Sequence, residues 1–161
     1  MYSVKKPAMF KVTLALVLSF FLVFTSAGSR AAAAYQSTDT WTIYWYVCGT
    51  DLESKSGAAS ADIQELLQVQ LPANVRVLIQ TGGAVEWHTP AIPAGAVGRY
   101  LYDKDGIHTL QELPDADMGS PDTLADFLRY GAKNYPADNR VCILWDHGGG
   151  SAAGVCYDER T

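Results

Sequence analysis

After residue 40, hydrophobic positions follow the pattern of a strand, a helix and a second strand. Trp41–Cys48 and residues 75–81 are mostly apolar, aromatic or β-branched, which is typical of strands buried on both faces of a parallel sheet. Between them, residues 58–71 carry apolar side chains at helical spacing, and Pro72 ends the predicted helix. This order predicts two parallel strands joined by a right-handed crossover.

The second half of the chain predicts a hairpin and a further helix. Residues 98–103 and 107–110 flank Lys104-Asp105-Gly106, and an Asp-Gly pair between two such runs is a hairpin signal. Ser120 followed by Pro121 is typical of a helix start, because the serine side chain caps the first free N–H groups. The expected apolar face of this helix consists of Leu124, Phe127, Leu128 and Ala132.

The stretch Val141-Cys-Ile-Leu-Trp-Asp-His-Gly-Gly-Gly-Ser151 joins a strand pattern to a glycine loop. Its apolar part predicts a third buried strand that begins at Arg140, and residues 155–157 are expected to start another strand or hairpin. Together the patterns predict an α/β fold with three parallel strands, two helices and an inserted hairpin. Ligands of such sheets bind beyond the carboxyl ends of the strands, which places Asp51 and His147 at one edge.

The beginning of the chain has the composition of an export signal. Three lysines precede an apolar run over residues 12–24, and small residues follow as far as Ala34. The apolar run is short for a membrane span, although an uncleaved N-terminal anchor is an alternative. We therefore expect a secretory signal peptide at 1–34, a short polar tether at 35–40 and one domain at 41–161. The protein would be secreted or held at the cell surface, with membrane contact only through the signal peptide.

Charge and length limit the function classes. The net charge of −5 becomes −8 or −9 when the signal peptide is removed, depending on whether Arg30 leaves with it. The remaining residues contain no Lys/Arg run, so a nucleic-acid partner is not expected. An acidic surface suits a basic ligand or a cation, although it also serves solubility alone.

The cysteines do not form a recognisable metal site. Cys48 and Cys142 lie in strand patterns and are expected to be buried thiols, and Cys156 is expected to be structural rather than reactive. An odd number of cysteines leaves at least one unpaired or in need of an external partner. The sequence has no Cys-x-x-Cys or His-Glu-x-x-His motif, and neither His88 nor His108 has a partner at ligand spacing.

His147 is the strongest candidate for chemistry. A histidine at the end of a strand can act as general acid or base near neutral pH, although a structural hydrogen bond is the alternative. The adjacent Gly148 can offer its backbone N–H to an oxyanion because no side chain obstructs it. Asp146 is expected to be structural or capping, since neighbours along a strand point to opposite faces.

Asp51 and Glu53 are candidates for substrate binding. Both belong to a predicted polar loop after the first strand and could line a pocket for a basic group. The alternative for each is a solvated turn or a helix cap.

Four motifs, taken together in their order, resemble the clostripain family of cysteine peptidases. They are Trp41-Thr-Ile-Tyr-Trp-Tyr46, Gly49-Thr-Asp-Leu-Glu53, Ala58-Ala-Ser-Ala-Asp-Ile-Gln-Glu65 and Ile143-Leu-Trp-Asp-His-Gly-Gly-Gly150. Gly154-Val-Cys-Tyr-Asp-Glu159 also resembles the family. The resemblance, from about residue 41 to the end, implies a caspase-like α/β/α sandwich with a mostly parallel sheet, incomplete in this chain. It also implies endopeptidase cleavage after Arg or Lys.

The resemblance implies roles for individual residues. His147 would belong to a Cys–His dyad, and Gly148 would supply an oxyanion-hole N–H. The family's nucleophilic Cys follows the next main strand, so this chain would lack it and be inactive alone. Arg160 would be a candidate site of internal processing. The chemistry requires no cofactor, and Asp158 with Glu159 are candidate calcium ligands, although two carboxylates do not make a site. The partner would be a peptide or protein with a basic P1 residue.

Two other classes of function fit parts of the sequence. His-Gly-Gly-Gly also occurs in the oxyanion loops of α/β-hydrolase esterases, but these need a Gly-x-Ser-x-Gly elbow. Gly149-Gly-Ser151-Ala-Ala153 lacks the last glycine and directly follows the oxyanion loop. The second alternative is a non-catalytic remnant or binding module that keeps the fold without the chemistry.

Overall fold

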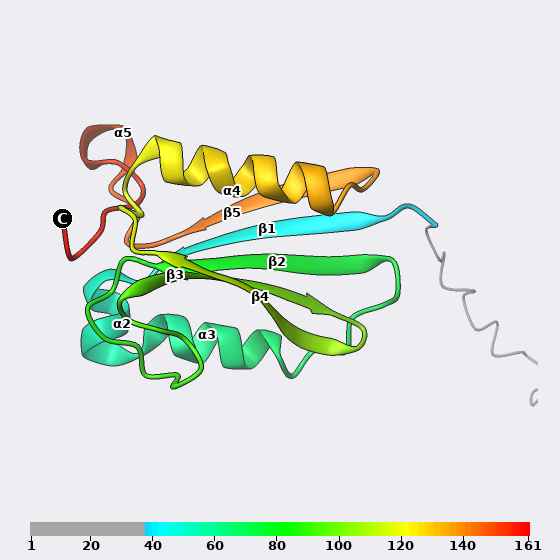
Figure 1. The fold of residues 1–161 in the computed structure, drawn as a ribbon, viewed down its shortest axis with the longest axis horizontal. Helices are drawn as coiled ribbons and strands as arrows, with labels where there is room; N and C mark the ends of the chain where they lie inside the picture. Colours follow the sequence, from blue (N-terminus) through cyan, green and yellow to red (C-terminus); the bar gives the residue numbers. More distant parts are fainter. Residues whose placement is uncertain (1–37) are drawn as a thin grey trace, which may run out of the picture. The chain divides into compact units, whose positions relative to one another are not determined.

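A computed structural model describes residues 38–161 (Figure 1). The strands are β1 (Trp41–Cys48), β2 (Val75–Gly82), β3 (Ala96–Asp103), β4 (Gly106–Pro114) and β5 (Asn139–Trp145). The helices are α2 (Thr50–Ser56), α3 (Ala58–Leu66), α4 (Pro121–Asn134) and the short α5 (Gly150–Ala153). The predicted signal peptide and the first part of the tether lie outside the described residues.

One five-stranded sheet, in the order β4-β3-β2-β1-β5, organises the described residues. The strand β1 pairs in parallel with β2 on one side and with β5 on the other, as the strand patterns predict. The predicted hairpin, β3 with β4, joins the same sheet through an antiparallel pairing of β3 with β2. The sheet is therefore mixed, with its parallel part at β2, β1 and β5.

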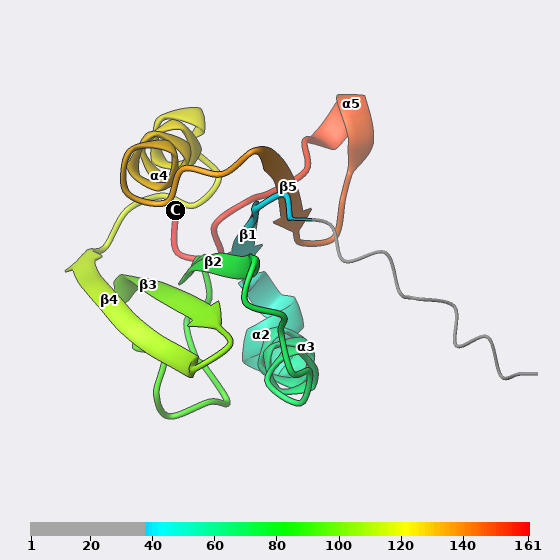
Figure 2. The ribbon, with the colours of Figure 1, turned by 90° about the vertical axis from the view of Figure 1, so that its right-hand side faces the viewer.

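Helices cover both faces of the sheet, as Figures 1 and 2 show, which gives the predicted α/β/α layers. Alternate residues of β1 point to the two faces, so Val47 packs with Ile63 of α3 while Tyr46 packs with Phe127 of α4. Tyr44 meets Phe127 edge to face at a centroid distance of 6.0 Å. Within residues 38–161, no helix has the length and apolar character needed to cross a membrane.

Two elements after β1 differ from the prediction. The expected polar loop at 50–53 is the first half of α2, a helix with few apolar residues and no apolar stripe to reveal it. The helix α3 ends at Leu66 instead of 71. The Tyr102 hydroxyl donates to the carbonyl of Val69 at 2.7 Å and lies 3.3 Å from that of Leu67, so it satisfies a backbone acceptor beyond the shortened helix.

The prediction that β5 is a buried strand is wrong. It lies at the edge of the described sheet, and Val141, Ile143 and Leu144 are 38–44% exposed. Cys142 is likewise exposed, whereas Cys48 is buried as predicted. An apolar run alone cannot distinguish a central strand from an edge strand, because both have the same local pattern.

Two smaller predictions are also corrected. Residues 155–157 form no strand, because the N–H of Tyr157 donates to the Asp146 carboxylate instead of to a neighbouring strand. The start of α4 is as predicted, with the Ser120 side chain accepting from Asp122 N–H. Its buried face, however, includes Gly131, while the adjacent Ala132 is exposed.

We expect Gly131→Ala to destabilise the protein even though alanine favours helices. A Cβ at this position would lie 2.0 Å from Cε1 of Tyr44, so the helix would have to move. The overpacking should cost about 1–3 kcal/mol in the free energy of unfolding, measured with urea. The exposed control, Ala132→Gly, should cost only about 1 kcal/mol. A stabilising Gly131→Ala would contradict the packing of α4 against β1.

Candidate active site

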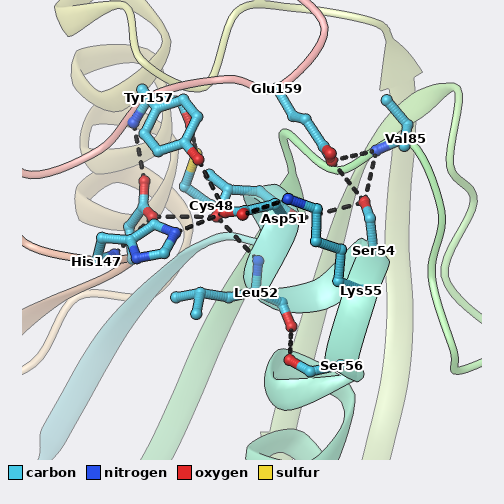
Figure 3. A network of polar contacts seen from close by, with 12 residues as sticks. Cys48, Asp51, Leu52, Ser54, Lys55, Ser56, Val85, His147, Tyr157 and Glu159 are labelled. Atoms are coloured by element: carbon cyan, nitrogen blue, oxygen red, sulfur yellow. Dashed lines mark hydrogen bonds and ion pairs between the residues drawn. The ribbon is translucent and has the colours of Figure 1, made fainter.

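His147 and Asp51 meet at the carboxyl edge of the parallel strands, as Figure 3 shows. His147 follows the end of β5, and Asp51 lies in the first turn of α2, just after β1. The His147 Nε2 atom lies 2.6 Å from Oδ1 of Asp51. Both side chains reach solvent, with exposed fractions of 45% for His147 and 29% for Asp51. The sheet thus brings together two of the residues that the sequence singled out.

Tyr157 completes this group, and no pattern in the sequence predicts its contacts. Its ring stacks on the imidazole of His147, with centroids 5.8 Å apart and planes 16° apart. Its hydroxyl donates to Oδ1 of Asp51 at 2.9 Å, so it contacts both partners of the pair. Tyr157 belongs to the family-like motif from Gly154 to Glu159, but the order of residues in that motif does not indicate that Tyr157 contacts His147 and Asp51.

Asp51 is held in its charged form. Hydrogen bonds from His147, Lys55 and Tyr157, in that order, hold the pKa of the Asp51 carboxyl well below its usual range. An ionised carboxylate can only accept, so Nε2 of His147 carries the proton that the two atoms share. The neutral imidazole then has its free electron pair on Nδ1. Within residues 38–161 the hydrogen bonds of His147 use Nε2 and the backbone N–H, which leaves Nδ1 for chemistry.

Asp146 holds the backbone around the pair and does not contact the imidazole. Its Oδ1 accepts from the His147 backbone N–H at 2.6 Å and from the Thr50 hydroxyl at 3.2 Å. Its Oδ2 accepts from the Tyr157 backbone N–H at 2.8 Å. Asp146 is therefore structural, as predicted, and it links the segments that carry His147, Tyr157 and Asp51.

Thr50 has a strained backbone directly before Asp51. It is buried and has a φ of 48°, which a β-branched residue adopts only when its surroundings compensate. The bond from its hydroxyl to Asp146 is one such compensation. The strained residue turns the chain from β1 into α2 and so directs Asp51 toward His147.

Glu53 has the contacts of a helix cap. It is fully buried, and its two oxygens accept from the backbone N–H and hydroxyl of Ser60 and from the backbone N–H of His88. These bonds fix the start of α3 to the loop after β2. Glu53 therefore has the helix-capping contacts that were the alternative to substrate binding. Asp51, in contrast, lies in the candidate site beside His147.

Gly148 has a backbone conformation that favours glycine, with a φ of 73°. Its N–H donates to the carbonyl of Val155 at 3.3 Å, and a Cβ built on it would meet nothing within 4 Å. The space on the side-chain side of Gly148 is thus open. Its service to an oxyanion stays a prediction, and the long bond to Val155 would have to be exchanged for it.

The end of the chain crosses the same edge of the sheet. The Asp158 carboxylate accepts from Met118 N–H, and Glu159 accepts from Ser54 and from the Val85 N–H. Arg160 donates to the Ala94 carbonyl and forms ion pairs with Asp115 and Asp158. Cleavage after Arg160 would require its side chain to leave these partners. The acidic residues of the described region do not gather into a cluster that could hold a metal ion.

A family model, that of the Clostripain family, matches residues 45–161. The chain belongs to the clostripain family. This membership confirms the resemblance found in the motifs and covers both His147 and Asp51. Among curated proteins no sequence matches the chain.

Solved structures of similar fold are cysteine proteases. A Bacteroides fragilis cysteine protease is 18% identical, with a TM-score of 0.54, and the match covers 70% of this chain and 92% of that one. A secreted C11 cysteine protease of Bacteroides thetaiotaomicron, in complex with an irreversible peptide inhibitor, is 19% identical with a TM-score of 0.52. The match covers 69% of this chain but 30% of that one.

A clostripain of B. thetaiotaomicron in complex with the peptide inhibitor BTN-VLTK-AOMK is a third example. It is 16% identical with a TM-score of 0.51, and the match covers 70% of this chain and 94% of that chain. At these identities the similarity establishes the fold alone, and the fold is the predicted caspase-like one.

The structural role of Glu53 leads to a stability prediction. Glu53→Gln should cost about 2–3 kcal/mol in the free energy of unfolding, because an amide N–H₂ replaces an acceptor that serves buried donors. The exposed Glu65→Gln on α3 should change it by less than about 0.5 kcal/mol. Urea denaturation measures both. A Glu53 variant of unchanged stability would contradict the capping role.

The lowered pKa of Asp51 leads to a pH-dependent prediction. An acid with a lowered folded-state pKa stabilises the fold above its unfolded pKa, and this contribution is lost as the pH falls through the folded-state value. Asp51→Asn should therefore have a lower free energy of unfolding than wild type at neutral pH, and the difference between the two free energies should narrow below about pH 4. Urea unfolding across this pH range measures it. Asp105→Asn, on the exposed hairpin turn, is the control. If the difference in unfolding free energy between wild type and Asp51→Asn did not change with pH, the prediction would be contradicted.

Proposed function

We propose that this chain is the N-terminal part of an exported cysteine endopeptidase that cleaves after Arg or Lys. The observation that carries the proposal is the group of His147, Asp51 and Tyr157, which orients an imidazole with Nδ1 free at the ligand edge of the sheet. Family membership supports thiol chemistry at this site. In this proposal the nucleophilic cysteine follows a strand beyond β5; within residues 38–161 the side-chain hydrogen bond of His147 goes to Asp51 and not to a cysteine.

In the proposed mechanism the thiolate attacks the scissile carbonyl while His147 serves as acid and then as base. The protonated Nδ1 gives its proton to the leaving amine, which breaks the C–N bond and leaves an acyl-enzyme. A water molecule then attacks the thioester and loses its proton to Nδ1, and the thiolate departs. The negative charge of Asp51 at Nε2 stabilises the imidazolium, which is present before the amine leaves and forms again when water loses its proton to Nδ1.

The oxyanion of each tetrahedral intermediate needs backbone donors. Gly148 N–H is the donor that this chain would supply, in exchange for its long bond to Val155. The N–H of the nucleophilic cysteine would be the second donor. Each donor is worth several kcal/mol of transition-state stabilisation, about 3 in a comparable protease site.

The free edge of β5 supports the position proposed for the nucleophile. On that side the strand has no neighbour in the described sheet, and its apolar residues are partly exposed. A strand paired in parallel with β5 would bring its carboxyl end beside His147. A cysteine at that end would then face Nδ1.

Several observations support a basic P1 residue and export. The acidic chain favours a positively charged substrate. The peptide VLTK, in the name of the inhibitor bound to the B. thetaiotaomicron clostripain, ends in lysine. Because Asp51 is engaged by His147, Lys55 and Tyr157, other acidic groups would bind the P1 side chain. Export is supported by the lysine-led apolar segment at 1–34.

The product of the full reading frame should hydrolyse Arg- and Lys-amide peptides. His147→Ala should lower kcat/KM by about 10³-fold or more, because the general acid is lost. Asp51→Asn should lower it by roughly 10–100-fold, as removal of a residue that orients a catalytic histidine does. His108→Ala, on the exposed hairpin, is the matched control with unchanged kcat/KM. The 161-residue chain alone should show no hydrolysis.

The same assay separates the alternatives. Inactivation by thiol alkylation supports the peptidase, whereas resistance to alkylation with sensitivity to serine-directed phosphonates would identify an esterase instead. A full-length protein that folds but cleaves neither amides nor esters would identify a non-catalytic module. Activity that survives chelation of calcium would show that no such ion is needed.

A further inference from the structure

Two cysteines that the proposed mechanism does not use lie together behind the site. Cys48 ends β1 and is completely buried, and Cys156 lies nine residues beyond His147 in the segment that returns across the sheet edge. Cys48 donates to the carbonyl oxygen of Tyr157, the residue directly after Cys156, at 2.8 Å. Cys156 packs on the same apolar cluster as Cys48, with Tyr46 and Met118.

The two thiols differ in access and in acidity. Cys156 is partly exposed and lines an open groove of about 230 Å³ together with Tyr46, Leu124 and Leu144. Interaction with the Cys48 thiol lowers the pKa of the Cys156 thiol, which favours its thiolate form. The contact with Cys156, with burial, raises the pKa of Cys48. One thiol is thus accessible and nucleophilic, and the other is protonated and protected.

We propose that Cys48 and Cys156 form a disulfide that ties the segment after His147 to the end of the central strand. Cys156 packs against the buried cluster that contains Cys48, the Cys48 thiol bonds to the residue after Cys156, and Cys156 lines a groove, so a small oxidant reaches Cys156 without unfolding. Cys142, which is exposed on β5, would remain the unpaired third cysteine. The inference does not depend on the proposed peptidase activity.

The oxidant assigned is a low-molecular-weight disulfide, RSSR, such as oxidised glutathione. The Cys156 thiolate attacks one sulfur of RSSR, forming a mixed disulfide and releasing RS⁻. Cys48 then attacks the Cys156 sulfur, the Cys48–Cys156 bond forms, and a second RS⁻ leaves. The thiol protons pass to the two RS⁻ groups, so two Cys–SH and RSSR become one cystine and two RSH. Secretion, proposed above, would expose the pair to such disulfides.

The bond would constrain the residue that follows Cys156. Tyr157 stacks on His147 and donates to Asp51, and the backbone of its segment is now held to β1 by a single S–H···O bond. A covalent link at the preceding residue limits how far Tyr157 can move from the imidazole. Reduction would leave the contacts in place but would free the segment to open.

The test is disulfide mapping of the full-length protein purified without reductant, with free thiols alkylated before digestion. Cleavage after Lys and Arg leaves Cys142 and Cys156 in one peptide, 141–160, so a second cut after Trp145 is required. The expected result joins the peptide of Cys48 to that of Cys156, with Cys142 alkylated. Alkylation of all three cysteines, also after treatment with oxidised glutathione, would overturn the proposal. A Cys142–Cys156 link would overturn it as well.

Thermal unfolding gives a second measurement. A crosslink that closes a loop of about 100 residues should raise Tm by roughly 10 °C over the reduced protein. Cys156→Ser should remove this dependence on reductant, and Cys142→Ser should keep it. If the Tm of wild type and of Cys156→Ser responded equally to reductant, the bond would not exist. The mapping needs no variant, so it remains decisive even if Cys156→Ser fails to fold.

Discussion

The pairing of β1 with strands on both sides is the constraint on which the rest of the described structure depends. Because β1 runs parallel to β2 and to β5, the carboxyl ends of all three strands meet at one edge. Val47 lies opposite Trp145, so a few residues further along each strand bring Asp51 and His147 within 2.6 Å. The helices and the hairpin complete the two cores, and this register, together with the turn at Thr50 and the bonds of Asp146, sets the distance between Asp51 and His147.

The sequence predicts elements well where one local pattern decides the structure. The Ser120-Pro121 start of α4 and the Asp-Gly turn of the hairpin depend on a few adjacent residues, and both are confirmed. The helix α2 was missed because it is held by a strained Thr50 and a buried Glu53, not by an apolar stripe. The exposure of β5 could not be predicted either, since it depends on which strand lies beside it.

In the candidate site, too, adjacent residues reveal the candidates but not the contacts between them. His147 and Gly148 are recognisable because a histidine and glycines directly follow an apolar strand, and Asp51 because it follows another. The bonds that His147 and Tyr157 donate to Asp51 join segments about one hundred residues apart, and no local pattern records them. The carboxylates at 51 and 53 look alike in the sequence, yet one reaches the imidazole and the other caps a helix inside the protein.

The separation of β1 from β5 along the chain also bears on when the fold can close. Thr40 and Asp138, which join the two strands at their start, are 98 residues apart. During synthesis, β1 therefore waits for its second neighbour until about one hundred further residues have been made, and such distant pairing slows folding. The nascent chain consequently stays incompletely folded until β5 has been made, and His147 meets Asp51 only after that delay.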